Sequence, residues 1–210
     1  MKLIGITAQR QNGKDSLADN IIKIYGENWL KESFANPVKK TFCEGFDFDE
    51  TKLEEWKVKD LCPPGMVKTV REALMYIGDG YRDIMPMIWV NKMANRLDHN
   101  KNYIIPDVRY VNELKFIKEN GGVVILIWRK GWENSINHNS EKTIYPAVVW
   151  CKNCGEEGEL LVHNWKLSDS TWHNAPPEIK YIDIFVRNDS DLDRLYEKSV
   201  KVAKLLGDIN

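Results

Sequence analysis

The chain has 210 residues, 43% of them hydrophobic, which is enough for one sizeable core with an added sub-structure. Its 30 Lys and Arg residues are offset by 31 Asp and Glu residues, and the formal net charge of -1 argues against a broad nucleic-acid-binding face. The N-terminus does not have the pattern of a signal peptide, and no apolar run approaches the length of a membrane span. We therefore expect a soluble, cytoplasmic protein with neither a nucleic-acid nor a membrane partner.

Predicted strands and helices alternate along most of the chain. Strands are expected in the apolar runs, and helices where apolar residues have helical spacing. A short strand, a Pro-opened turn and a short helix are expected over 32–46, whereas 47–68 is predicted to be irregular. The expected strands are 2–7, 102–109, 123–128 and 181–186, and the expected helices are 14–25, 70–78 with a stop at Gly78, 87–99, 111–120 and 190–206.

The alternation predicts an α/β fold with a parallel sheet and helices on both of its faces. In such a sheet the loops that follow the strands meet in one cleft at the C-terminal edge. Residues 142–180 interrupt the alternation and are expected to be an insertion, a small hairpin or zinc-ribbon-like element, within a single domain spanning 1–210.

Residues 5–16, GITAQRQNGKDS, are similar to a phosphate-binding loop with two departures from the usual pattern. That pattern is Gly, four residues, then Gly-Lys-Ser/Thr, but Ala8 occupies the first Gly position and Asp15 the Ser/Thr position. A strand, a Gly-containing loop and a helix start direct free N–H groups at a phosphate, and Lys14 adds a mobile positive charge. The alternative is an Asn-Gly-Lys surface turn, but the strand before and the long helix after favour the phosphate loop.

The two departures make separate structural demands. Ala8 fits only if its φ is negative or the turn relaxes, whereas Asn12-Gly13 adopts positive φ at low cost. Asp15 replaces a hydroxyl that normally binds Mg²⁺, and a carboxylate can serve the same ion directly or through water. Ser16 supplies a hydroxyl one residue later.

Asp107 ends an apolar strand, where a second Mg²⁺-organising carboxylate belongs in a phosphate-loop enzyme. Its alternative role is to cap the following helix, which carries Glu113 in its first turn. Cations near the ends of predicted elements suit phosphoryl transfer, where catalysis is mostly positioning and charge neutralisation, although any one of them alone is more often a solvated surface residue. These cations are Arg10, Lys39, Arg71, Arg82, Arg109 and Arg129.

Cys151 and Cys154 have the Cys-x-x-Cys spacing of half a zinc site. His163 and His173 follow and would complete four ligands for a structural Zn²⁺, although the second half has no common spacing. The alternative is a hairpin with two reduced thiols at its turn, because a chain without an export signal seldom carries disulfides.

Taken together, the motifs resemble the deoxynucleoside monophosphate kinases of tailed bacteriophages. The segment RQNGKDSLAD is similar to the family's phosphate loop, in which Gly-Lys-Asp-Thr/Ser is normal, so Asp15 follows the family pattern while Ala8 departs from it. The other matching segments are short, but they occur in family order from residue 1 to 141 and again from about 181. They are SFANPVKK, TVREALMYIGDGYRD, IWVNKM, YIIPDVRYVNEL, HNSE at 138–141 and VRNDSDLDRL.

The resemblance implies a P-loop nucleotide kinase with a three-layer fold, found in the host cytoplasm if the protein is phage-encoded. ATP and Mg²⁺ would lie on Gln11, Asn12, Gly13, Lys14, Asp15, Ser16 and Leu17, with Asn188 near the adenine. The acceptor would be held by Arg10, Val38, Lys39, Arg71, Gly78, Trp89, Asp107, Arg109 and Glu113. The catalytic group would be Lys14, Arg10, Asp15, Arg109 and Arg129, with Asp15 and Ser16 organising Mg²⁺.

Two other functions stay open from the sequence. One is a phosphate-loop kinase for another small acceptor, such as dephospho-coenzyme A. The other is a nucleotide-dependent or zinc-dependent binding module whose insertion grips a partner. Aromatic residues of the insertion could also form a homodimer contact, because such residues anchor interfaces. They are Tyr145, Trp150, Trp165 and Trp172.

Overall fold

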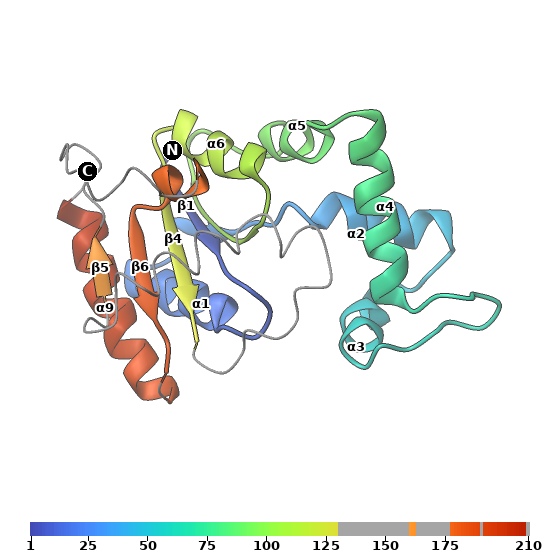
Figure 1. The fold of residues 1–210 in the computed structure, drawn as a ribbon, viewed down its shortest axis with the longest axis horizontal. Coiled ribbons are helices and arrows are strands. Elements are labelled where there is room, and N and C mark those ends of the chain that lie inside the picture. Colours follow the sequence, from blue (N-terminus) through green and yellow to red (C-terminus); the bar gives the residue numbers. More distant parts are fainter. Residues whose placement is uncertain (130–159, 163–176, 190, 209–210) are drawn as a thin grey trace. The chain divides into compact units, whose positions relative to one another are not determined.

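The computed structural model describes residues 1–129, 160–162, 177–189 and 191–208 (Figure 1). Its internal contacts divide the chain into two compact units. One consists of Met1–Glu32 and Asp98–Asn210, and the other of Ser33–Leu97. Most of the expected 142–180 insertion lies outside the described residues, so the insertion within a single domain stays a prediction.

The first unit is built on a six-stranded sheet with the order β2-β3-β1-β4-β6-β5. Five neighbouring strands are parallel, and β5 runs antiparallel to β6. The parallel sheet expected from the alternating sequence is therefore confirmed. The strands are β1 (Leu3–Thr7), β2 (Trp29–Lys31), β3 (Asn102–Val108), β4 (Val123–Trp128), β5 (Leu160–Val162) and β6 (Ile184–Arg187).

Helices cover both faces of this sheet, which gives the expected three layers. On one face, α1 (Lys14–Tyr25) and α9 (Leu192–Asp208) pack together over the side chains of Ile4, Ile125 and Ile184. On the other face, α6 (Val111–Glu119) packs against β1 and β4, and a short 3-10 helix, η3 (Pro177–Tyr181), contacts it. All residues of β1 and β4 are buried, as expected for central strands of a covered parallel sheet.

Gly122 lies between α6 and β4, where the chain runs close to the backbone of both α6 and β1. A Cβ atom there would lie 2.8 Å from the backbone oxygens of both Ile117 and Leu3, which cannot move aside easily. We expect Gly122→Ala to lower the free energy of unfolding by about 1–3 kcal/mol, because overpacking forces a backbone shift. Gly207→Ala in α9 is the control, since nothing lies within 4 Å of that position. Urea unfolding checks both variants, and equal stabilities would contradict the close packing.

The second unit is helical and has its own small core. Phe42, Leu53, Val70 and Ala73 form this core, and Trp56 packs against it. The helices are α2 (Asn36–Gly45), α3 (Leu53–Val58), α4 (Val70–Ile84) and α5 (Ile88–Ala94), with the 3-10 helix η1 (Glu50–Lys52) before α3.

Two sequence predictions for this unit are wrong. Residues 47–68 contain η1 and α3, because Leu53 and Trp56 supply a short apolar face that charged neighbours obscure in the sequence. The helix from Val70 does not stop at Gly78 but continues to Ile84. Gly78 is buried in mid-helix, and its carbonyl oxygen accepts a 2.9 Å hydrogen bond from the Trp89 indole, so packing offsets the low helix propensity of glycine.

Other differences concern boundaries. The short strand expected within 32–46 is β2, which lies earlier, at Trp29–Lys31, because pairing with Asn102–Ile104 selects these residues. The last parallel strand begins at Ile184 and not at Tyr181, which is the last residue of η3. Among the residues that the structure describes, no helix combines the length and apolarity needed to cross a membrane.

Candidate phosphate-binding site

The loop between β1 and α1 has two residues with positive φ just before the helix. Gln11 has a φ of 64° and Gly13 a φ of 92°, so two residues just before the helix are left-handed. Positive φ was expected at Asn12 and Gly13, but the structure gives it to Gln11 in place of Asn12. Ala8 is not among the described positive-φ residues, and its methyl group is buried at 1% exposure in the sheet core. An alanine is therefore accommodated at the first Gly position.

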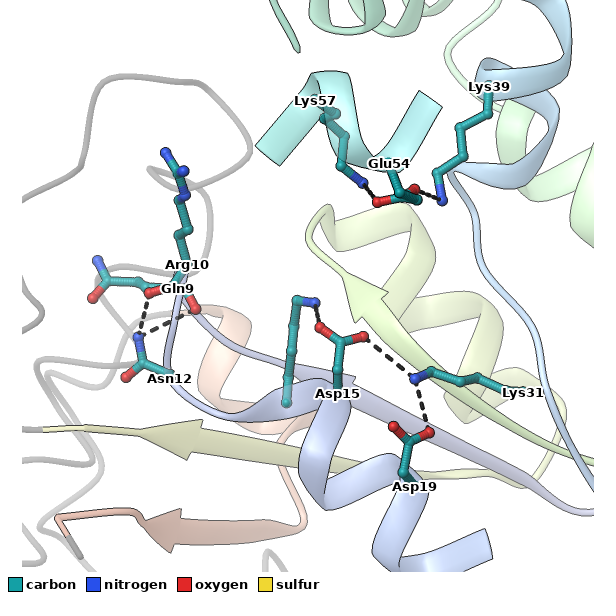
Figure 2. Close-up of polar contacts among 10 residues, drawn as sticks. Gln9, Arg10, Asn12, Asp15, Asp19, Lys31, Lys39, Glu54 and Lys57 are labelled. Atoms are coloured by element: carbon teal, nitrogen blue, oxygen red, sulfur yellow. Dashed lines mark hydrogen bonds and ion pairs between the residues drawn. The ribbon is translucent and has the colours of Figure 1, made fainter. Parts of the chain in front are cut away.

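The first turn of α1 presents backbone donors and two charged side chains. Gly13 precedes the helix without a side-chain cap, and the first N–H groups of a helix have no intrahelical acceptor. The Lys14 ammonium contacts the Asp15 carboxylate, and Lys31 from β2 reaches Asp15 at 3.6 Å and Asp19 at 2.9 Å (Figure 2). Burial alone would raise the pKa of Asp15, but the two ammonium groups hold it below its ordinary value.

A cavity of about 470 Å³ opens at this helix start. That volume is within the range of small-molecule sites. Five of its lining residues are those predicted to hold ATP on the loop, and Arg129 and Asn188 converge on it from the ends of β4 and β6. The lining residues are Gln11, Gly13, Lys14, Asp15, Ser16, Arg129, Asn188, Asp191, Leu192 and Leu195.

Three predicted loop residues do not line this cavity. Asn12 is fully buried, and its side chain turns back to the loop, where Nδ2 donates to the carbonyl oxygens of Gln9 and Arg10 (Figure 2). Leu17 is fully buried in the core beneath α1. The Arg10 side chain is exposed and extends away from Asn12.

The end of β3 contributes a bulge beside β1. Gly5 pairs with Ile105 but Thr7 pairs with Val108, so β3 has one extra residue in the Pro106–Asp107 region. Proline cannot donate to a sheet, and a bulge is one of the few places where a strand accepts it. Glu113 is 2% exposed, and its Oε2 accepts from the backbone N–H groups of Arg109 at 2.7 Å and Tyr110 at 3.1 Å. Glu113 thus caps α6, the role weighed above for Asp107.

The acceptor residues predicted in the second unit fall into two groups. Val38, Gly78 and Trp89 are buried, and Trp89 donates its indole N–H to Gly78. Lys39 and Lys57 both contact the Glu54 carboxylate, Lys39 at 2.6 Å (Figure 2). Arg71 bonds the Asp60 carboxylate at 2.6 Å and the Lys57 carbonyl oxygen at 2.8 Å. Lys57 was not predicted as a site residue. It shares the Glu54 carboxylate with Lys39, and its carbonyl oxygen accepts from Arg71, so it connects these two predicted cations.

Glu54 gives this cation group a dependence on pH. Burial would raise the Glu54 pKa, but Lys39 and Lys57 outweigh it and lower the pKa from 4.5 to about 2. A lowered pKa contributes stability that is complete above pH 4.5 and is lost as pH falls through about 2. We expect Glu54→Gln to be less stable than wild type at pH 7, by at most about 1 kcal/mol since the pairs are half exposed. The difference should shrink as pH falls through about 2.

Urea unfolding of wild type and Glu54→Gln at pH 7 and near pH 2 measures this effect. Glu50→Gln is the control, because Glu50 is an exposed carboxylate in the same unit. A stability difference for Glu54→Gln that stays constant between the two pH values would show that the lysine contacts do not stabilise the carboxylate.

The possible Zn²⁺ ligands Cys151, Cys154, His163 and His173 lie outside the described residues. Sequence reasoning also missed Lys31 and three cavity residues from the start of α9, Asp191, Leu192 and Leu195. Leu192 begins the apolar pattern of α9, but it is 72% exposed and lines the cavity, and no signal in the sequence distinguishes it from the positions that face the core.

The comparisons with known proteins include a sequence relative and weak structural resemblances. No protein-family model matches the chain. The chain is similar to the solved structure of a dephospho-CoA kinase from Campylobacter jejuni (15% identity, covering 98% of both chains, TM-score 0.43). It is also similar to the solved structure of a "putative kinase" from Chloroflexus aurantiacus (9% identity, covering 97% of this chain and 96% of that one, TM-score 0.38). Both TM-scores lie below 0.5, so these two resemblances establish no common activity.

A viral protein gives the stronger match. The "Putative deoxynucleotide monophosphate kinase" of Acanthamoeba polyphaga mimivirus is 32% identical over 158 residues. The match covers 67% of this chain and 81% of the mimivirus protein. At this identity and coverage, the chain belongs to the same kinase family as that mimivirus protein.

Proposed function

We propose that the protein transfers the γ-phosphoryl group of ATP to a deoxynucleoside 5'-monophosphate and releases ADP and the diphosphate. One observation carries this proposal: a cavity at the start of α1 is lined by Gly13, Lys14 and Ser16, from a loop with left-handed residues at Gln11 and Gly13. Family membership supports the choice of a monophosphate as acceptor.

The reaction requires charge neutralisation more than acid–base chemistry. An oxygen of the acceptor phosphate forms a bond to the γ-phosphorus while the bond from that phosphorus to the β–γ bridging oxygen breaks. The acceptor is already an anion, so no general base is needed. Lys14 and the N–H groups at the start of α1 would hold the β- and γ-phosphates, and Arg10 and Arg129 would neutralise the migrating charge.

Mg²⁺ would add Lewis-acid stabilisation of the transferred phosphoryl group when bound. Asp15 and Ser16 fit this ion, because both line the cavity and both offer oxygen, which Mg²⁺ prefers. The lowered pKa of Asp15 keeps its carboxylate charged at neutral pH. Binding of the ion there would require Asp15 to exchange lysine contacts for the metal.

The acceptor site is proposed from the remaining predicted residues. Asp107 lies near the end of β3 and Arg109 directly follows it, and Glu113 would act by fixing the backbone of Arg109, to which it is bonded. In the second unit, the family resemblance alone supports acceptor contacts by Val38, Lys39, Arg71, Gly78 and Trp89. Asn188, which lines the cavity, would lie near the adenine of ATP.

A coupled assay of ADP release over a panel of acceptors tests the proposal. The panel contains the four deoxynucleoside monophosphates, their ribose counterparts and dephospho-coenzyme A. We expect turnover with at least one deoxynucleoside monophosphate and none with dephospho-coenzyme A. Turnover with dephospho-coenzyme A alone would replace the proposed acceptor, and turnover with no acceptor would favour a binding module.

A further inference from the structure

Asn12 is a fully buried polar residue in a loop whose neighbours Arg10 and Gln11 are exposed. Its Nδ2 donates to the carbonyl oxygen of Gln9 at 3.2 Å and to that of Arg10 at 3.0 Å (Figure 2). These two bonds close the turn that contains the left-handed Gln11 and that directly precedes the left-handed Gly13. The amide therefore holds the loop in the shape in which it faces the cavity.

The same residue joins the loop to two strands that are distant in sequence. Its Oδ1 accepts a hydrogen bond from the backbone N–H of Arg129, directly after β4. Its carbonyl oxygen accepts from Nδ2 of Asn188, directly after β6, at 2.9 Å. Asn188 is 4% exposed, and its backbone N–H donates to the Trp128 oxygen at 2.7 Å, so the strand ends are also tied to each other. Three segments of the cavity wall thus meet at Asn12.

The chemistry of the side chain limits what can replace it. An amide both donates and accepts, and here both functions are used. A carboxylate of the same size could accept from Arg129 but could not donate to the two carbonyl oxygens. A hydroxyl group could form only some of these side-chain hydrogen bonds. Buried groups that lose such partners carry a full desolvation cost, so the loop would move to satisfy them.

We propose that Asn12 is a positioning residue: it contacts no nucleotide through its side chain but fixes the phosphate loop and the backbone of Arg129. The proposal rests on the proposed function for the identity of the ligand, a nucleoside triphosphate. Its readout, however, is binding of MgATP, which does not depend on the acceptor. This role differs from the direct cofactor contact predicted for Asn12 from the sequence.

Calorimetric titration with MgATP tests the proposal on Asn12→Asp, with Asn20→Asp as the matched control. Asn20 lies on α1, where its Nδ2 donates to Ser199 Oγ on α9 at 3.1 Å, and it does not line the cavity. Both changes remove an amide donor from an internal contact of the same unit. We expect Asn12→Asp to weaken MgATP binding on the order of 10²-fold at equal folded fraction, because two buried carbonyls lose their donor. Asn20→Asp should lower stability and leave MgATP affinity within about threefold of wild type.

An MgATP affinity of Asn12→Asp within about threefold of wild type would overturn the proposal. An equal loss of MgATP affinity in Asn12→Asp and Asn20→Asp would also overturn it, because it would indicate a structural role alone. If Asn12→Asp does not fold, the neutral Asn12→Ser replaces it, with an expected loss of roughly tenfold and unchanged affinity as the contrary result. Wild-type protein that binds MgATP but phosphorylates no monophosphate would contradict the proposed function alone. Wild-type protein that does not bind MgATP would contradict both.

Discussion

Lys14→Met is expected to lower kcat/KM on the order of 10³-fold, an effect typical of losing a charge-stabilising group at a phosphoryl or oxyanion site. Lys14 lines the cavity at the start of α1, its side chain is only 18% exposed, and its ammonium contacts the Asp15 carboxylate, another lining residue. Methionine preserves the stem and removes the charge. Steady-state kinetics with the best deoxynucleoside monophosphate, at varied ATP, measure the effect.

Lys23→Met is the control for this change. Lys23 lies in the last turn of the same helix, is exposed, and is not a lining residue of the cavity. We expect its kinetics to match wild type, with little change in the free energy of unfolding for either variant. Near-normal turnover by Lys14→Met would show that the loop does not hold the transferred phosphoryl group.

Gly13→Ala is the second change with a large expected effect. Gly13 has a φ of 92°, and a Cβ atom there would lie 2.5 Å from Nδ2 of Asn188, which is itself bonded to the Asn12 carbonyl oxygen. Alanine would therefore be strained and would also displace Asn188 from the loop. We expect a loss of about 2–4 kcal/mol in the free energy of unfolding, from left-handed strain and overpacking together. Activity per folded molecule should fall on the order of 10²-fold because the phosphate position moves.

Gly26→Ala separates backbone strain from the clash. Gly26 ends the same helix with a φ of 82°, and nothing lies within 4 Å of a Cβ atom there. This variant should lose stability through strain but keep wild-type kinetics once folded. Equal activity losses in the two variants, measured at matched folded fraction by circular dichroism and initial rates, would show that the contact with Asn188 is unimportant.

Much of the first unit could be predicted from sequence, because its signals are local. The buried runs of β1, β3 and β4 and the helical spacing of α1 and α6 each identify an element, and alternation implies a parallel order. Family membership is confirmed through a mimivirus relative, while a bacteriophage origin stays a prediction. The unusual Ala8 has a local explanation too, since it lies at the strand end with its methyl group in the core.

The features that sequence did not predict depend on tertiary contacts. Gly78 suggests a helix stop by propensity, yet the buried contact with Trp89 lets α4 continue. The sequence predicts that Asn12 is a turn residue that contacts the cofactor. In the structure, hydrogen bonds with Arg129 and Asn188, more than 100 positions away, turn it inward. Leu192 and Leu195 join the cavity only because α9 packs beside α1. No local pattern contains these pairings.

The central claim is that the cavity at the start of α1 supports phosphoryl transfer from ATP to a deoxynucleoside monophosphate. Its most direct test is quantification of ATP, ADP, monophosphate and diphosphate in one reaction by ion-exchange chromatography, with wild type and Lys14→Met side by side. The account predicts one deoxynucleoside diphosphate for each ADP formed by wild type, and almost none from Lys14→Met. ADP formed without any diphosphate, or equal diphosphate from both proteins, would contradict it.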